Sequence, residues 1–192
     1  MDGTLTVAVH DFDAIRRRLD IPPGASILEF IAALPPAEAR QRTAELDAIE
    51  GEFAQLATPQ PGARALLEAL LERGNRIAVL TRNSKALAHE TLEGAGLADL
   101  FETGVVLGRE SAAPKPAPDG IQAILATWSA DAGDACMMGD FIYDLEAGQN
   151  AGVAAIYFDP NDENKWTAHC DLRVAHHQTL LTLLHESGVA PI

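Results

Sequence analysis

The chain has 192 residues, of which 47% are hydrophobic, and its formal net charge at pH 7 is −14. This length predicts one domain, or one domain with a small insertion. The strong negative charge argues against polyanionic partners, so we expect neither nucleic acid nor an anionic membrane surface to bind. Two cysteines provide no disulfide framework. No signal-peptide pattern begins the chain and no apolar run reaches the ~20 residues of a membrane helix, so a cytoplasmic protein is expected.

Residues 12–58 show a helical pattern throughout. Apolar residues recur with a period near 3.6, which is typical of amphipathic helices. They include Ile27, Leu28, Ile31 and Leu34, and then Leu46, Ile49, Phe53 and Leu56. Pro35-Pro36 separates two helices, and Pro36 is placed to begin the second. Because no strand pattern interrupts this stretch, it predicts a compact helical insert.

After residue 59 short apolar strands alternate with helices. We expect strands at 77–80, 105–107, 135–138, 154–158 and 172–174. This alternation predicts a parallel sheet covered on both faces, with its ligands at the carboxyl ends of the strands. Asp119 is expected to be the N-cap of the following helix. We expect Cys136 to be buried in its strand, and His176-His177 to lie on the surface.

Four polar segments stand at predicted strand ends or helix starts. They are Asp2-Gly3-Thr4-Leu5-Thr6, Thr81-Arg82-Asn83, Lys115 between two prolines, and Gly139-Asp140 with Asp144 four residues later. In order and spacing these segments resemble the signature of the haloacid dehalogenase superfamily. The phosphoglycolate-phosphatase-like branch is the most similar, and the resemblance extends over essentially the whole chain.

The resemblance implies an α/β fold, with a Rossmann-like three-layer parallel-sheet core formed by residues 1–11 and 59–192. Residues 12–58 would form a small helical cap. In the family the first segment reads Asp-x-Asp and ends a central strand, between the strands that precede Thr81 and Asp140. Here Met1 stands at the x position, so the first strand and the nucleophilic Asp are absent from this chain. We expect that Met1 is an internal methionine taken as the start, or that the chain was trimmed at this point. The alternative is a natural short form of the protein. Loss of a central strand would leave unpaired backbone groups on two facing sheet edges.

The resemblance also assigns roles to the polar residues. Asp2 would be the general acid/base, and the Thr81 hydroxyl with the N–H groups of Arg82 and Asn83 would hold the phosphoryl group. Lys115 would add a positive charge there. Without the other segments, Asp2 before a glycine is typical of a turn, Thr81 of a strand-end cap, and Lys115 of a solvated surface lysine.

Asp140 and Asp144 are the candidate metal ligands. Their spacing of four across a helix start lets both face one cation, and hard oxygen ligands suit Mg²⁺. By resemblance, the backbone carbonyl of Asp2 and the absent Asp would complete the site. The alternative is that the two carboxylates cap the helix and offset its dipole.

These features predict a Mg²⁺-dependent phosphatase that hydrolyses a small phosphorylated metabolite through an aspartyl-phosphate. Phosphoglycolate is the substrate that the family suggests, and activity of the 192-residue chain is expected to be impaired. One alternative is a catalytically inactive binding protein with the same fold. A sugar phosphomutase shares the four segments, but its cap would have to hold a bisphosphate and let it turn over. A cap of fewer than 50 residues is small for that task.

Overall fold

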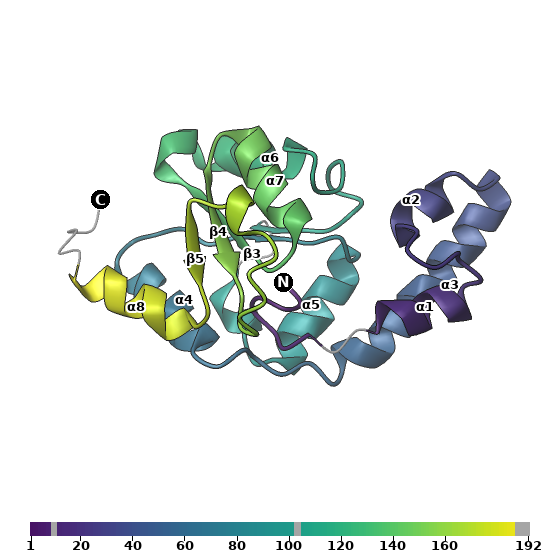
Figure 1. Ribbon diagram of the computed structural model, residues 1–192, viewed down its shortest axis with the longest axis horizontal. Helices are drawn as coiled ribbons and strands as arrows, with labels where there is room; N and C mark the ends of the chain where they lie inside the picture. The colour runs from purple at the N-terminus through teal and green to yellow at the C-terminus, as the bar shows by residue number, and fades with distance from the viewer. Residues whose placement is uncertain (9–10, 102–104, 187–192) are drawn as a thin grey trace.

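The computed structural model describes residues 1–8, 11–101 and 105–186. Three helices lie together at one end of the molecule (Figure 1), and they are α1 (Phe12–Arg18), α2 (Ile27–Ala32) and α3 (Pro36–Ala54). Pro36 begins α3, as predicted. The three helices pack around an apolar cluster of their own, which contains Ile15, Leu19, Ile21, Ile31, Leu46 and Ile49. The helical character of this segment is confirmed, and its role as a cap stays a prediction.

The remainder alternates between helices and strands. Its helices are α4 (Ala63–Glu72), α5 (Lys85–Gly94), α6 (Asp119–Trp128), α7 (Ile142–Ala151) and α8 (His177–Glu186). Its strands are β1 (Val79–Leu80), β2 (Val106–Leu107), β3 (Cys136–Gly139), β4 (Ala154–Phe158) and β5 (Leu172–Val174). Short 3₁₀ turns are η1 (Ala98–Leu100), η3 (Ala132–Asp134) and η4 (Thr167–His169). The bounds of β4 and β5 agree with the prediction, and the other strands lie within two residues of it.

The strands form two sheets. One contains β1 and β2, the other has the order β3-β4-β5, and every pair of neighbours is parallel. Helix α7 packs on β3 and β4, α5 packs on β2, and α8 packs on β5 and α4. The predicted α/β fold with parallel strands is confirmed.

A cavity of about 830 Å³ borders both sheets. Val79 and Leu80 of β1 and Cys136 to Met138 of β3 line it, together with apolar side chains of α4, α6 and α8. In the described part of the chain, β1 pairs with β2 alone and β3 with β4 alone. Cys136 is exposed because it faces this cavity, so the prediction of a buried cysteine is wrong.

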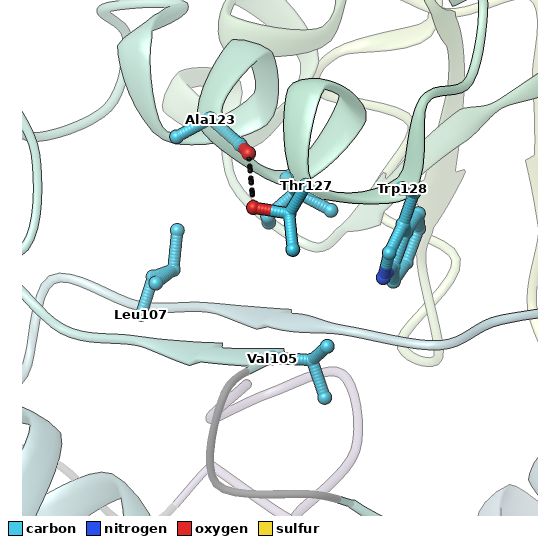
Figure 2. A pocket seen from close by; sticks show the side chains of 6 residues that line it. Val105, Leu107, Ala123, Thr127 and Trp128 are labelled. Carbon is cyan, nitrogen blue, oxygen red and sulfur yellow. Dashed lines mark hydrogen bonds between the residues drawn. The ribbon is translucent and has the colours of Figure 1, made fainter.

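Helix α6 begins at Asp119, and Pro118 holds the N-cap position. The predicted N-cap role of Asp119 is therefore wrong, because the chain enters the helix one residue earlier, and the carboxylate lies in the first turn. A hollow of about 40 Å³ separates α6 from β2 and is lined by Val105, Leu107 and Trp128, among others (Figure 2). Thr127 donates to the Ala123 carbonyl of its own helix at 2.8 Å, so its hydroxyl is already satisfied there.

Across residues 1–8, 11–101 and 105–186, no helix has both the length and the apolar character needed to cross a bilayer.

Candidate active site

The first residues form a tight turn against the carboxyl end of β3. The N–H groups of Thr4, Leu5 and Thr6 all donate to the Met1 carbonyl, at 3.1, 2.7 and 3.2 Å. Gly3 adopts a φ of +81°, and a β-carbon there would overlap the Asp140 carboxylate. Glycine is thus required both for its backbone conformation and for this close approach. The turn brings the backbone beside Asp2 against Asp140.

Asp140 follows directly after β3, and its carboxylate is held by the turn. The Thr4 hydroxyl donates to Asp140 Oδ1 at 2.6 Å. Burial raises the pKa of the Asp140 carboxyl, although the N-terminal ammonium and the Thr4 hydroxyl act in the opposite direction. A nearby cation would stabilise the ionised form of this partly dehydrated carboxylate.

Lys115 and Asp144 form a buried ion pair. Lys115 Nζ contacts Asp144 Oδ1 and donates to the Leu80 carbonyl at 2.7 Å, and the two side chains are 6% and 9% exposed. Asp144 Oδ2 accepts the N–H of Phe141 at 3.1 Å, which closes the first turn of α7. Burial alone would raise the pKa of Asp144, but Lys115 and the N-terminal ammonium outweigh it, and the pKa is lowered. Asp144 therefore does cap its helix, as the alternative interpretation held, and it also neutralises Lys115.

The loop after β1 reaches the carboxylate of Asp2. Thr81 Oγ1 accepts the N–H of Asn83 at 3.1 Å, and Asn83 Nδ2 donates to Asp2 Oδ2 at 2.9 Å. The Thr6 hydroxyl donates to Asp2 Oδ1 at 3.3 Å. The N–H of Asn83, predicted to face a phosphoryl group, is thus engaged by Thr81, while its side chain orients Asp2.

Arg82 extends from the same loop toward helix α2. Its Nη1 donates to the Lys115 carbonyl, and its Nη2 lies 2.7 and 2.8 Å from the two carboxylate oxygens of Glu29. The guanidinium also stacks over the Tyr143 ring, 4.9 Å from the ring centroid. No role was predicted for this side chain, since the resemblance involved only the backbone of Arg82.

Direct hydrogen bonds therefore link the four predicted segments in succession: Asn83 donates to Asp2, Thr4 to Asp140, and Lys115 to Asp144. The sequence profile of the haloacid dehalogenase-like hydrolases matches residues 1–152. The chain belongs to this family.

Relatives of this haloacid dehalogenase-like hydrolase include two curated bacterial proteins. A phosphoglycolate phosphatase of Rhodospirillum rubrum is 40% identical over 100 residues, which are 52% of this chain and 41% of the relative. A probable phosphatase, IndB, of Dickeya dadantii is 32% identical over 159 residues, or 79% of this chain and 67% of the relative. The chain thus spans less than half the length of the first of these relatives.

A solved hydrolase from Pseudomonas syringae shares the fold. It superposes with a TM-score of 0.80 at 19% sequence identity, covering 98% of this chain and 96% of that structure. At this identity the likeness establishes the fold alone.

The loop after β2 makes a second contact with helix α3, which was not predicted from the sequence. Arg109, just after β2, contacts Asp47 and lies 3.1 Å from Glu50 Oε2, and both carboxylates belong to α3. Burial raises the pKa of Glu50 to about 7, against the opposing effect of Arg109, and the charges of Asp47 and Asp2 add to the rise. A charged residue two positions after a predicted strand was the available signal.

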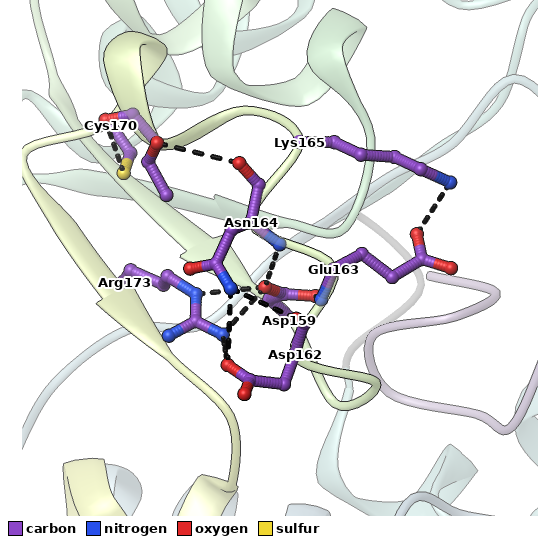
Figure 3. Close-up of polar contacts among 8 residues, drawn as sticks. Asp159, Asp162, Glu163, Asn164, Lys165, Cys170 and Arg173 are labelled. Carbon is purple, nitrogen blue, oxygen red and sulfur yellow. Dashed lines mark hydrogen bonds and ion pairs between the residues drawn. The ribbon is translucent and has the colours of Figure 1, made fainter.

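A network of hydrogen bonds and ion pairs at the carboxyl end of β4 stabilises the following loop (Figure 3). Asp159 accepts the N–H groups of Glu163 and Asn164 at 3.0 and 2.9 Å and the Nε of Arg173 at 2.8 Å. Arg173 also contacts Asp162. These bonds tie the loop after β4 to β5, and they leave the acidic side chains neutralised by an arginine.

In the described ranges, no three carboxylate, imidazole or thiolate side chains are grouped so as to hold a metal ion. The oxygen donors near the turn are the Asp140 carboxylate, the Asp144 carboxylate bound to Lys115, and the backbone carbonyls of the first segment. This donor set fits a hard cation that keeps several waters, as Mg²⁺ does.

Proposed function

We propose that this protein is a Mg²⁺-dependent phosphatase acting on a small phosphomonoester, with a phosphoglycolate-like compound as the substrate. The observation that carries the proposal is the meeting of Thr81, Lys115 and Asp140 around the turn that bears Asp2. A hydroxyl, an ammonium and two carboxylates near the carboxyl ends of β1 and β3 can neutralise a phosphoryl group and move a proton. The phosphatase names of the two curated relatives support the same reaction class.

Each residue has a distinct part in the proposed reaction. The Thr81 hydroxyl and Lys115 Nζ would bind phosphoryl oxygens, and Asp2, oriented by Asn83, would protonate the leaving oxygen and later deprotonate water. Asp140, Asp144 and the Asp2 carbonyl would hold Mg²⁺. When bound, this ion supplies positive charge to the phosphoryl oxygens.

The attacking carboxylate is proposed to lie two positions before Asp2, on an extended segment that precedes Met1. The cavity along β1 and β3 and the open edges of these strands support this placement. A strand ending at Met1 would therefore deliver its last carboxylate to the site, and the 192-residue chain alone would be impaired.

The test compares the 192-residue chain with a form extended by the codons upstream of Met1. Hydrolysis of p-nitrophenyl phosphate with Mg²⁺ is expected to be negligible for the first and restored in the second. Changing the upstream Asp to Asn in the extended form should abolish turnover again. Full activity of the 192-residue chain would refute this account of the nucleophile.

A catalytically inactive binding protein is the second candidate. The observation in its favour is that Lys115 and Asp144 neutralise each other, so both have a structural use without any ligand. Such a protein would carry no upstream Asp, and its extended form would stay inactive while still binding phosphate.

A further inference from the structure

The Arg82 guanidinium lies between the phosphoryl-binding residues and the helices of residues 12–54. On its inner side it donates to the carbonyl of Lys115, and one face covers the ring of Tyr143, which stands between Asp140 and Asp144 on the chain. On its outer side it binds the carboxylate of Glu29 and lies 3.4 Å from Ser26 Oγ. The guanidinium therefore belongs to the residue that follows Thr81 and is bonded to the backbone of Lys115, the two residues of the proposed phosphoryl site.

Lys115, Arg109 and Arg82 differ in how firmly they are neutralised. Lys115 is paired with Asp144, whose side chain is 9% exposed, and Arg109 with Glu50, which is 10% exposed. Arg82 is 20% exposed and its partner Glu29 is 53% exposed. An exposed carboxylate can return to water at little cost, so Glu29 is the counter-ion that a ligand can replace.

We propose that Arg82 recognises a carboxylate carried by the substrate close to its phosphate ester, and that Glu29 occupies this position when no substrate is bound. The planar guanidinium suits a carboxylate, and a carboxylate already sits against it here. Glu29 is thus an internal competitor that dissociates on binding. The inference rests on the proposed phosphatase function and assigns the recognition of the substrate carboxylate to Arg82.

The test is a binding measurement, so it requires no turnover. Isothermal titration of the 192-residue chain with Mg²⁺ compares 2-phosphoglycolate with ethyl phosphate, which has the same ester but a methyl group in place of the carboxylate. A charge-assisted hydrogen bond predicts about a 10- to 100-fold preference for 2-phosphoglycolate. The readout is the ratio of the two affinities, because a purely structural role would weaken both ligands alike.

Four variants define the expected pattern. Arg82→Gln should bring the ratio close to one, and Arg82→Lys should retain part of the preference because it keeps the charge. Glu29→Gln should raise the ratio, since a neutral amide competes less well for the guanidinium. Arg64→Gln, which removes a surface ion pair with Asp99, is the matched control and should leave the ratio unchanged.

Each outcome decides the matter. Equal affinities in the unaltered chain, or an unchanged ratio in Arg82→Gln, would overturn the role of Arg82 while leaving the phosphoryl site standing. Failure of both ligands to bind would overturn the phosphoryl site itself and this inference with it.

Discussion

His177 Nε2 lies 2.8 Å from the carbonyl oxygen of Thr4, although 173 positions separate the two residues. A carbonyl can only accept, so Nε2 carries the proton and donates. The imidazole is fully buried and stacks on Phe158 with 4.3 Å between ring centroids, and its Nδ1 has no hydrogen-bond partner. The first residue of α8 thus supports the turn whose Thr4 hydroxyl holds Asp140, and the prediction of a surface His177 is wrong.

Replacing His177 by Phe should destabilise the protein by about 1–3 kcal/mol, because the aromatic stack is kept but the Thr4 carbonyl loses its donor. Burial lowers the pKa of His177 from 6.5. As the pH falls below 6.5, His177 therefore binds a proton in the unfolded state but not in the folded state, and the free energy of unfolding declines. His177→Phe should remove that part of the decline in urea unfolding. Equal stability of both proteins at neutral pH would contradict the supporting role.

Glu50 should make the protein less stable as the pH rises. Its folded pKa of about 7 exceeds the ordinary 4.5, so from pH 4.5 to 7 the folded state retains a proton that the unfolded state has lost. The free energy of unfolding should fall by up to about 1.4 kcal/mol per pH unit in this window. Glu50→Gln should flatten the profile, whereas Glu38→Gln, at an exposed position of the same helix, should not. Parallel profiles for the native chain and Glu50→Gln would show that burial of Glu50 has no such effect.

Lys115→Met should cost about 3–5 kcal/mol of unfolding free energy, because it leaves the buried Asp144 carboxylate without its cation. The double variant Lys115→Met/Asp144→Asn removes both charges and should recover much of this loss. Chemical denaturation of the two variants measures the difference. A single variant as stable as the native chain would mean that Lys115 does not compensate Asp144.

Cys136 offers a test of the proposed upstream strand. Its thiol is exposed to the cavity, while surrounding apolar groups raise its pKa, so it should react with a maleimide at mildly alkaline pH. In the extended form a strand in the cavity should protect Cys136, and Cys170 serves as the internal reference. Mass spectrometry of the labelled peptides measures both rates. Equal labelling of Cys136 in the two forms would place the upstream segment elsewhere.

Much of the fold was predictable because its signals are local. The apolar runs at 154–158 and 172–174 became β4 and β5 with the predicted bounds, and Pro36 marked the start of α3. Thr81 and Asp140 directly follow β1 and β3, and the carboxyl ends of parallel strands gather polar groups, so the placement of these two residues followed from their positions along the chain. The helix start at Asp119 was misjudged by one residue, because proline-rich segments can enter a helix without a side-chain cap.

The amino-acid sequence by itself determined the order of helices and strands and the parallel direction of the strands, since periodicity and spacing are properties of neighbouring residues. Tertiary structure decided the partners: Asp144 with Lys115, Glu29 with Arg82, and His177 with Thr4. It also decided that Cys136 faces a cavity. Burial and pairing depend on which distant segments approach one another, and no local pattern records that approach.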